Sequence, residues 1–307
     1  MNDQIIDEIE SALRHGNVIP YIGPGVLSLV ADGQAVPASA EALVAKLTAS
    51  SSVPPKLRKN LTGAAQFMEN FKHRKTVSAA MTAAFGREAS PSDLHHLLAR
   101  IPNLPLIVHA WYDDLPQKAF ASRENWGVVQ GVSQAEHYGQ WVHYFHKDGT
   151  RAADDAAAAA VCPEAGDWKT LIYQPIGSIS PAKNYLVSDS DYVEVLTEID
   201  IQTPIPQRIQ ELRVDRNFLF LGCRFSTQLE RTFARQIMKR SSSKHWAVLP
   251  EEPTRNEARF MLEQNIQRVE MHLGEFIQSL SSLVEEAALM SIPPIIDSIA
   301  PIQALAS

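Results

Sequence analysis

The chain has 307 residues, 45% of them hydrophobic and 21% charged, so it can bury a full core, and disorder over most of its length is excluded. Its 28 basic and 35 acidic residues give a net charge of −7, which argues against binding to nucleic acid. The two cysteines, Cys162 and Cys223, are too few for a disulfide framework or a four-thiolate zinc site.

The first 14 residues predict an amphipathic helix rather than a targeting segment. Ile5, Ile9 and Leu13 share one helical face, and the acidic residues among them are the opposite of a cationic signal peptide. No apolar run in the chain reaches the roughly 18 residues of a membrane-spanning helix. Because few cysteines are typical of a reducing compartment, we expect a cytoplasmic protein without membrane contact.

A buried strand is predicted next, at 17–22, and it ends in a Gly-Pro-Gly turn at 23–25 that leads into another helix. Residues 50–55 have the composition of a linker, and residues 56–85 carry a helical pattern without a strand signal. We interpret the region of about 50–90 as a small helical insertion.

The rest of the chain alternates between strands and helices. Strands are predicted at 104–109, 128–132, 141–145, 171–173, 217–221, 244–249 and 268–272. Helices are predicted at 93–100, 189–196, 206–213, 227–239, 255–264 and 275–289. An alanine-rich stretch within about 148–167 is interpreted as a surface excursion. The alternation predicts an α/β fold over residues 1–289, a doubly wound, Rossmann-like and mostly parallel sheet with helices on both faces.

Four strand ends carry glycine, aromatic and acidic residues in a fixed order. The segments are IPYIGPGVLS at 19–28, LIVHAWYDDL at 106–115, LIYQPIGSI at 171–179 with YLVSDSDY at 185–192, and FLFLGC at 218–223. Together they resemble the sirtuin-like NAD-binding domains of bacterial NAD hydrolases and related proteins. The resemblance extends over roughly residues 5–285.

This resemblance implies a site for NAD or ADP-ribose at the carboxyl end of the sheet. A Gly-x-Gly turn brings backbone N–H groups close to a pyrophosphate, and Gly23, Gly25 and the Ser28 hydroxyl stand at such a turn. Pro24 removes one N–H group from it. No metal is expected. The other candidate cofactor residues are Trp111, Tyr112, Asp113, Gly177, Ser178, Gly222 and Arg224.

The departures from the family pattern concern its chemistry. Where the family has an Asn near the nicotinamide ribose and a His that acts as the base, this chain has Trp111 and Ile176. Tryptophan has no amide carbonyl, and isoleucine cannot accept a proton. Arg224 and Thr227 stand where the family has the Ser and Asp that help to hold the adenosine half. The sequence therefore predicts that the scaffold is kept and the usual catalysis is lost.

Histidines offer two further candidate sites. His109 ends a predicted strand two residues before Trp111, and with Asp113 it is the candidate replacement base of a rewired enzyme. His137, His143 and His146 lie within ten residues. Because a metal needs about three convergent ligands, we interpret these three as exposed residues of an amphipathic strand.

We therefore expect a catalytically degenerate sirtuin-like protein that acts as a sensor, regulator or assembly partner, a role compatible with retained NAD or ADP-ribose binding. The first alternative is an NAD-hydrolysing or ADP-ribose-processing enzyme with rewired residues. The second is a ligand-free structural subunit in which Trp111 and Ile176 fill the pocket.

The C-terminal residues 290–307 form an apolar, proline-rich tail in which Asp297 is the only charged residue. Disordered tails are usually polar, whereas apolar side chains favour burial. Pro293 and Pro294 block extension of the preceding helix. We expect residues 291–307 to dock on a second copy of the chain, giving a homo-oligomer, or on a partner protein.

Overall fold

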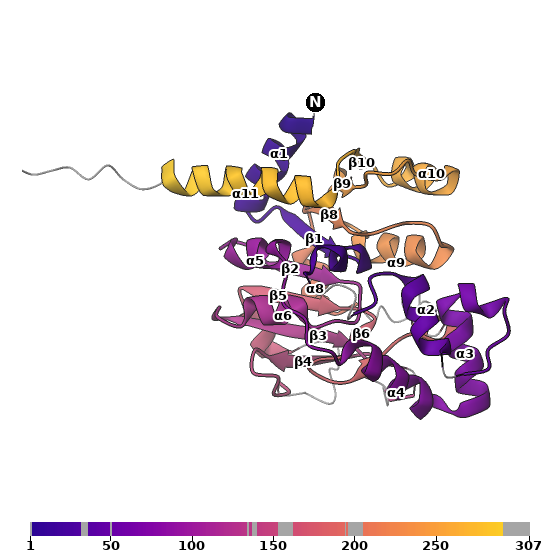
Figure 1. The fold of residues 1–307 in the computed structure, drawn as a ribbon. Coiled ribbons are helices and arrows are strands. Elements are labelled where there is room, and N and C mark those ends of the chain that lie inside the picture. Colours follow the sequence, from indigo (N-terminus) through magenta and orange to yellow (C-terminus); the bar gives the residue numbers. More distant parts are fainter. Residues whose placement is uncertain are drawn as a thin grey trace, which may run out of the picture.

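The computed structural model describes residues 2–31, 36–49, 51–133, 135–136, 140–152, 162–193, 195 and 205–290. An eight-stranded sheet with the order β10-β9-β8-β1-β2-β5-β3-β4 forms its centre (Figure 1). The strands are β1 (Val18–Ile22), β2 (Leu106–His109), β3 (Trp126–Gly131), β4 (Val142–His146), β5 (Thr170–Gln174), β8 (Asn217–Leu221), β9 (His245–Val248) and β10 (Ile266–Val269). Every neighbouring pair is parallel except β3 and β4, so the predicted α/β fold is confirmed.

Helices cover both faces of this sheet. The α-helices are α1 (Asn2–Arg14), α2 (Ala40–Thr48), α3 (Leu61–Lys72), α4 (Arg74–Phe85), α5 (Asp93–Arg100), α6 (Leu115–Phe120), α8 (Gln207–Leu212), α9 (Gln228–Met238), α10 (Arg255–Glu263) and α11 (Leu273–Met290). The 3₁₀ helices are η1 (Pro24–Leu29), η2 (Leu57–Lys59) and η3 (Pro163–Gly166). None of the helices within the described ranges is both long and apolar enough to cross a membrane.

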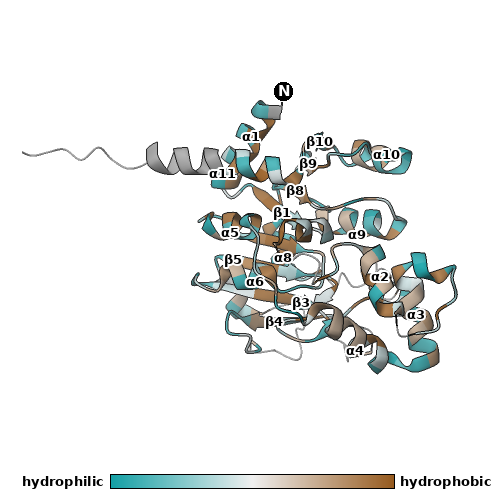
Figure 2. Ribbon diagram, viewed as in Figure 1, coloured by the Kyte–Doolittle hydropathy of each residue, from teal (hydrophilic) through white to brown (hydrophobic). Residues whose placement is uncertain are grey.

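The two faces of the sheet bury two cores. On β1, Ile19 and Tyr21 face the core that α2, α3, α4, α9 and α10 cover, and Val18 and Ile22 face the core under α1, α5, α6 and α11. All five residues of β1 are buried, as expected for a parallel sheet covered on both sides. Figure 2 shows these apolar strands at the centre of the molecule, with polar residues on the outer helix faces.

Helices α2, η2, α3 and α4 form a lobe at one end of the molecule, and we call residues 40–87 the helical lobe (Figure 1). Ser39 and Asn60 cap α2 and α3 through side-chain oxygens that accept N–H groups of the first turn. The lobe overlaps the range of about 50–90, and α2, which precedes that range, packs against both α3 and α4.

Several details differ from the predicted elements. The turn at 23–25 leads into the 3₁₀ helix η1 and not into an α-helix. Strand β10 begins at Ile266, two residues before the predicted start, because Asn265 adopts a φ of 51° and turns the chain immediately after α10. A short antiparallel hairpin of β6 (Gly177–Ser178) and β7 (Asn184–Tyr185) was not predicted. His137 and the tail 291–307 lie outside the described residues.

Candidate functional site

The sheet has a topological switch point between β1 and β8. The chain passes from β1 to β2 on one side, and from β8 to β9 on the other. In open α/β sheets, ligands bind outside the carboxyl ends of the strands at such a point. The candidate site therefore consists of the turns after β1, β2 and β8, together with the hairpin β6–β7.

At this switch point the two glycine turns bond to each other. The N–H group of Gly23 donates to the Leu221 carbonyl at 2.9 Å, and the N–H group of Gly25 donates to the Gly222 carbonyl at 2.9 Å. Pro24 has no N–H group. The donors that the sequence assigned to a pyrophosphate are thus bonded within the protein.

Close approach of the two turns explains why they contain glycine. A Cβ atom on Gly25 would lie 2.8 Å from the Gly222 carbonyl oxygen. Gly222 has a φ of 63°, and a Cβ atom there would lie 2.4 Å from the backbone nitrogen of Val26. Glycine is needed at these positions because a residue without a Cβ atom allows the backbones of the two turns to come into contact.

Other polar groups beside these turns are also bonded internally. The Ser28 hydroxyl donates to the Gly25 carbonyl at 2.7 Å. The Cys223 thiol contacts the Tyr21 carbonyl at 3.4 Å, and burial raises the pKa of this thiol. Cys223 packs against the core that contains Tyr21, and a thiol with a raised pKa is a poor nucleophile.

Arg224 forms an ion pair with a buried carboxylate of α10. Its Nε and Nη2 atoms lie 2.9 and 3.0 Å from the two carboxylate oxygens of Glu257, which is fully buried, and Nη1 contacts Glu251. Burial raises the pKa of Glu257, but the Arg224 pair and hydrogen bonds from Thr254 outweigh it and lower the pKa to about 2. The bidentate pair fixes the start of α10 against the turn after β8.

Trp111 and Ile176 are both buried. The indole N–H of Trp111 donates to the Pro37 carbonyl at 2.8 Å, and its ring meets Phe85 of α4 edge-on at 5.9 Å. Ile176 belongs to the same core. Both side chains are therefore held within the core that α2, α3 and α4 cover.

Tyr112 and Ser178 tie the turn after β2 to the hairpin β6–β7 and the segment that follows it. The Tyr112 hydroxyl donates to the Leu186 carbonyl at 2.7 Å. The Ser178 hydroxyl lies 3.1 and 2.9 Å from the carbonyls of Tyr112 and Asp113. Gly177 has a φ of 78°, and a Cβ atom there would lie 2.2 Å from the Asn184 carbonyl oxygen.

His109 and Asp113 form a buried pair, Nε2 to Oδ2 at 3.1 Å. Burial raises the pKa of Asp113, but the neighbouring His109 outweighs it, so the pKa lies below its ordinary value. Strand alternation places His109 on the same face as Ile107, in the core under α5 and α6. This face is opposite to the core that contains Trp111.

Arg74 of α4, which no sequence motif marks, is bonded to the motif segment 185–192 far along the chain. Its Nη1 atom lies 2.7 Å from the Asp191 carboxylate and 3.1 Å from that of Glu69, and Nη2 contacts the Tyr185 carbonyl. The same Asp191 oxygen accepts the N–H groups of Val187 and Ser188. Asp191 thus joins segment 185–192 to the helical lobe.

The histidines of β4 show no metal site. His146 pairs with Glu164 at 3.0 Å and meets the Trp168 ring edge-on, while His143 packs beside Phe145. Over the described ranges, no three His, Cys, Asp or Glu side chains converge as metal ligands would.

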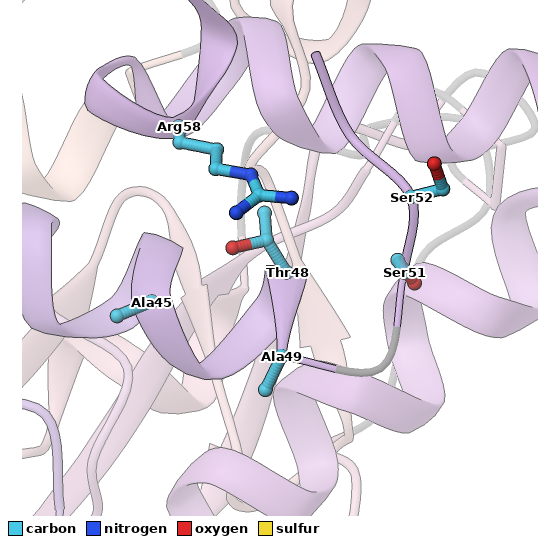
Figure 3. Close-up of a pocket in the computed structure, with 6 residues that line it drawn as sticks. All are labelled: Ala45, Thr48, Ala49, Ser51, Ser52 and Arg58. Carbon is cyan, nitrogen blue, oxygen red and sulfur yellow. The ribbon is translucent and has the colours of Figure 1, made fainter. Parts of the chain in front are cut away.

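Two open hollows of about 580 Å³ lie away from the switch point, and neither is lined by a candidate site residue. One lies between α5, α6 and α11. The other lies in the helical lobe, where Arg58 reaches over Thr48 and faces the segment that carries Ser51 and Ser52 (Figure 3).

His95 of α5 makes stability depend on pH. It is buried, it accepts the Ser92 N–H in a capping box, and burial lowers its pKa to about 4 from 6.5. As the pH falls below about 6.5, the imidazole of the unfolded chain takes up a proton before that of the folded chain does. The contribution of neutral His95 to the free energy of unfolding is therefore complete above about pH 6.5. It is lost as the pH falls towards 4, at up to about 1.4 kcal/mol per pH unit.

We expect His95→Gln, which keeps a capping-box acceptor without titrating, to reduce this loss in urea unfolding at pH 7.5, 6 and 5. The free energy of unfolding of His95→Gln should still fall somewhat with pH, because burial also lowers the pKa of His245 to about 4. The control is His96→Gln, at the exposed neighbouring position. If the free energy of unfolding fell equally with pH in the wild type and in His95→Gln, His95 would not be the source of the pH dependence.

A model of the SIR2-like domain family matches residues 105–269, more than half of the chain. The chain belongs to the SIR2-like domain family. In this SIR2-like protein the matched range contains β2 to β10, and the first motif at 19–28 lies outside it.

A solved structure described as "Structural Basis for the Mechanism and Regulation of Sir2 Enzymes" is 11% identical to this SIR2-like protein. It covers 93% of this chain and 99% of its own, with a TM-score of 0.39. A comparison with curated proteins gives no match.

Proposed function

We propose that this SIR2-like protein is non-catalytic and acts through assembly with another chain. One observation carries the proposal: the polar groups expected to serve a nucleotide at the switch point bond to the protein itself. The N–H groups of Gly23 and Gly25, the Ser28 hydroxyl and the Arg224 guanidinium all have internal partners.

The residues present at this turn do not fit the pyrophosphate of NAD or ADP-ribose. A phosphate cradle needs backbone N–H groups that point at the ligand, and here those of Gly23 and Gly25 point at carbonyls. A ligand would have to replace both hydrogen bonds. This favours a scaffold over a nucleotide sensor.

The rewired enzyme is disfavoured by the position of its base. A general base must lie within hydrogen-bond reach of the proton it removes. His109 is 1% exposed and Asp113 is 3% exposed, and the two bond to each other beneath α5 and α6. Trp111 and Ile176 supply no base in their place.

The partner is proposed to be a second copy or another protein. The apolar tail 291–307, which lies outside the described residues, remains our proposed contact with it. Its composition favours burial, since Asp297 is its only charged residue. A cytoplasmic location is part of the same proposal.

We expect the purified protein, incubated with NAD, to release no nicotinamide above the enzyme-free background. The reason is the missing base, whose loss typically costs about 10²- to 10⁴-fold in rate. We also expect millimolar ADP-ribose to leave the melting temperature unchanged. An active NAD hydrolase assayed in parallel is the positive control.

Two outcomes would contradict the proposal in different ways. Robust nicotinamide release that disappears in His109→Ala would establish the rewired enzyme. A bound nucleotide at 100 times its dissociation constant would stabilise the fold by about 2.7 kcal/mol, and such a shift would establish the sensor.

A further inference from the structure

The helical lobe has a charge opposite to that of the rest of the chain. Residues 40–87 carry eight lysines and arginines against two glutamates, a net charge of +6. The remaining residues carry 20 basic against 33 acidic side chains, a net charge of −13. Such an asymmetry indicates a surface for an anionic partner.

Most cations of the lobe have no anionic partner among the residues that the structure describes. Six exposed side chains form no ion pair with any described residue, whereas Arg74 pairs with Asp191 and Glu69. The six are Lys56, Arg58, Lys59, Lys72, Lys75 and Arg87. Unpaired charges of one sign repel each other, and an opposite charge from outside relieves that repulsion.

Contacts within the lobe join part of this surface into one patch. The Lys72 ammonium lies 3.4 Å from the Ser51 hydroxyl, and Ser51 lines the hollow that Arg58 also lines (Figure 3). Phe71, next to Lys72, is 72% exposed, and its ring packs on Phe67 at 4.4 Å. An exposed aromatic ring beside unpaired cations is typical of a protein interface.

An acidic surface, opposite in charge to the helical lobe, lies at the other end of the molecule. Helices α1 and α11 pack together, and over residues 2–14 and 273–281 they contain five acidic residues against one basic residue, a net charge of −4. Asp3, Asp7 and Glu275 are exposed and form no ion pair with any described residue. Figure 1 shows α1 and α11 at the opposite end of the molecule from α2, α3 and α4.

We propose that the helical lobe docks on the α1–α11 end of a second copy of this chain. The inference rests on the proposed assembly role and adds a second, electrostatic contact to the one proposed for the tail 291–307. A second copy suits the lobe better than nucleic acid does, because a long polyanion crossing the lobe would also meet the acidic remainder of the chain. Since two different surfaces meet, the contact repeats from copy to copy and builds a ring or a filament.

The test is association of the full chain in light scattering and sedimentation at low and high salt. We expect growth beyond a dimer at about 0.01 M salt and its loss at about 1 M, because the Debye length falls from about 30 to about 3 Å. Two neutralised variants remove one surface each: Arg58→Gln with Lys72→Gln and Lys75→Gln, and Asp3→Asn with Asp7→Asn and Glu275→Gln. Each alone should weaken association at least tenfold.

Mixing the two neutralised variants gives the decisive result. One intact lobe and one intact α1–α11 end remain in the mixture, so we expect a dimer of unlike variants and nothing larger. The matched control is Lys169→Gln with Lys183→Gln and Lys239→Gln, three exposed lysines outside the lobe. It removes the same charge and should associate like the wild type.

A monomer at low salt up to the limit of solubility would overturn the proposal, as would association that both neutralised variants retain. Binding to a single-stranded oligonucleotide is measured as well. If the variant with the neutralised lobe loses this binding but associates with itself like the wild type, the lobe binds nucleic acid and the proposal is wrong. Nicotinamide release is measured on the same preparations. Turnover of NAD would refute the non-catalytic role but not the contact between the lobe and the α1–α11 end. A monomer that does not turn over NAD would refute only this contact.

Discussion

Replacing Arg74 by Met is expected to lower the free energy of unfolding by about 3–5 kcal/mol, the usual cost of removing one partner from a buried ion pair. The Asp191 side chain is 1% exposed and would lose its pairing with the Arg74 guanidinium. The Tyr185 carbonyl would lose a donor at the same time. The measurement is urea unfolding at pH 7.

The next residue on α4 supplies the control. Lys75 is exposed and unpaired among the described residues, so Lys75→Met should change stability by no more than about 0.5 kcal/mol. Adding Asp191→Asn to Arg74→Met should recover part of the loss, because it removes the uncompensated charge. If Arg74→Met costs no more than Lys75→Met, the pair does not hold segment 185–192 to the lobe.

Gly177→Ala is expected to destabilise the fold by about 3 kcal/mol, through backbone strain and overpacking together. The new Cβ atom would lie 2.2 Å from the Asn184 carbonyl oxygen, at a φ of 78° that side chains rarely adopt. Backbone has to move to relieve this contact, since the atom it meets is a carbonyl of the paired strand β7. Thermal and urea unfolding report the loss.

Gly166→Ala is the matched control for this substitution. Nothing lies within 4 Å of a Cβ atom on Gly166, so the variant should be neutral or slightly more stable. A Gly177→Ala protein as stable as Gly166→Ala would show that the hairpin β6–β7 tolerates a side chain. The requirement for glycine there would then be wrong.

The parts of the fold predicted from sequence are those whose signal is local. The apolar runs at 17–22 and 217–221 became β1 and β8, neighbours at the centre of the sheet, because parallel strands buried on both faces carry near-continuous apolar runs. Thr227 and Thr254 mark the starts of α9 and α10 through capping boxes. The hairpin β6–β7 has two residues per strand, too few for a period to be seen.

The sequence predicted which residues lie at the candidate site, but not which groups they are hydrogen-bonded to. Sequence placed Gly23, Gly25 and Gly222 at strand ends, yet whether their backbone meets a phosphate or another turn depends on tertiary approach. The partners of Arg224 and Asp191 are 33 and 117 residues away, at Glu257 and Arg74. Asp191 was a visible motif residue, but nothing in the pattern of α4 distinguished Arg74 from the cations beside it.

Trp111 also bears on how this lineage could change. Converting it to the family's Asn would remove a buried indole, at a cost of about 3–5 kcal/mol by analogy with truncation to Ala. It would also take the donor from the Pro37 carbonyl and place an amide beside Phe85 and Tyr112. Domains are stable by about 5–15 kcal/mol, so this first step consumes much of the margin before a base at position 176 could confer any activity. An amide at position 111 therefore costs folding free energy before it could contribute to any chemistry.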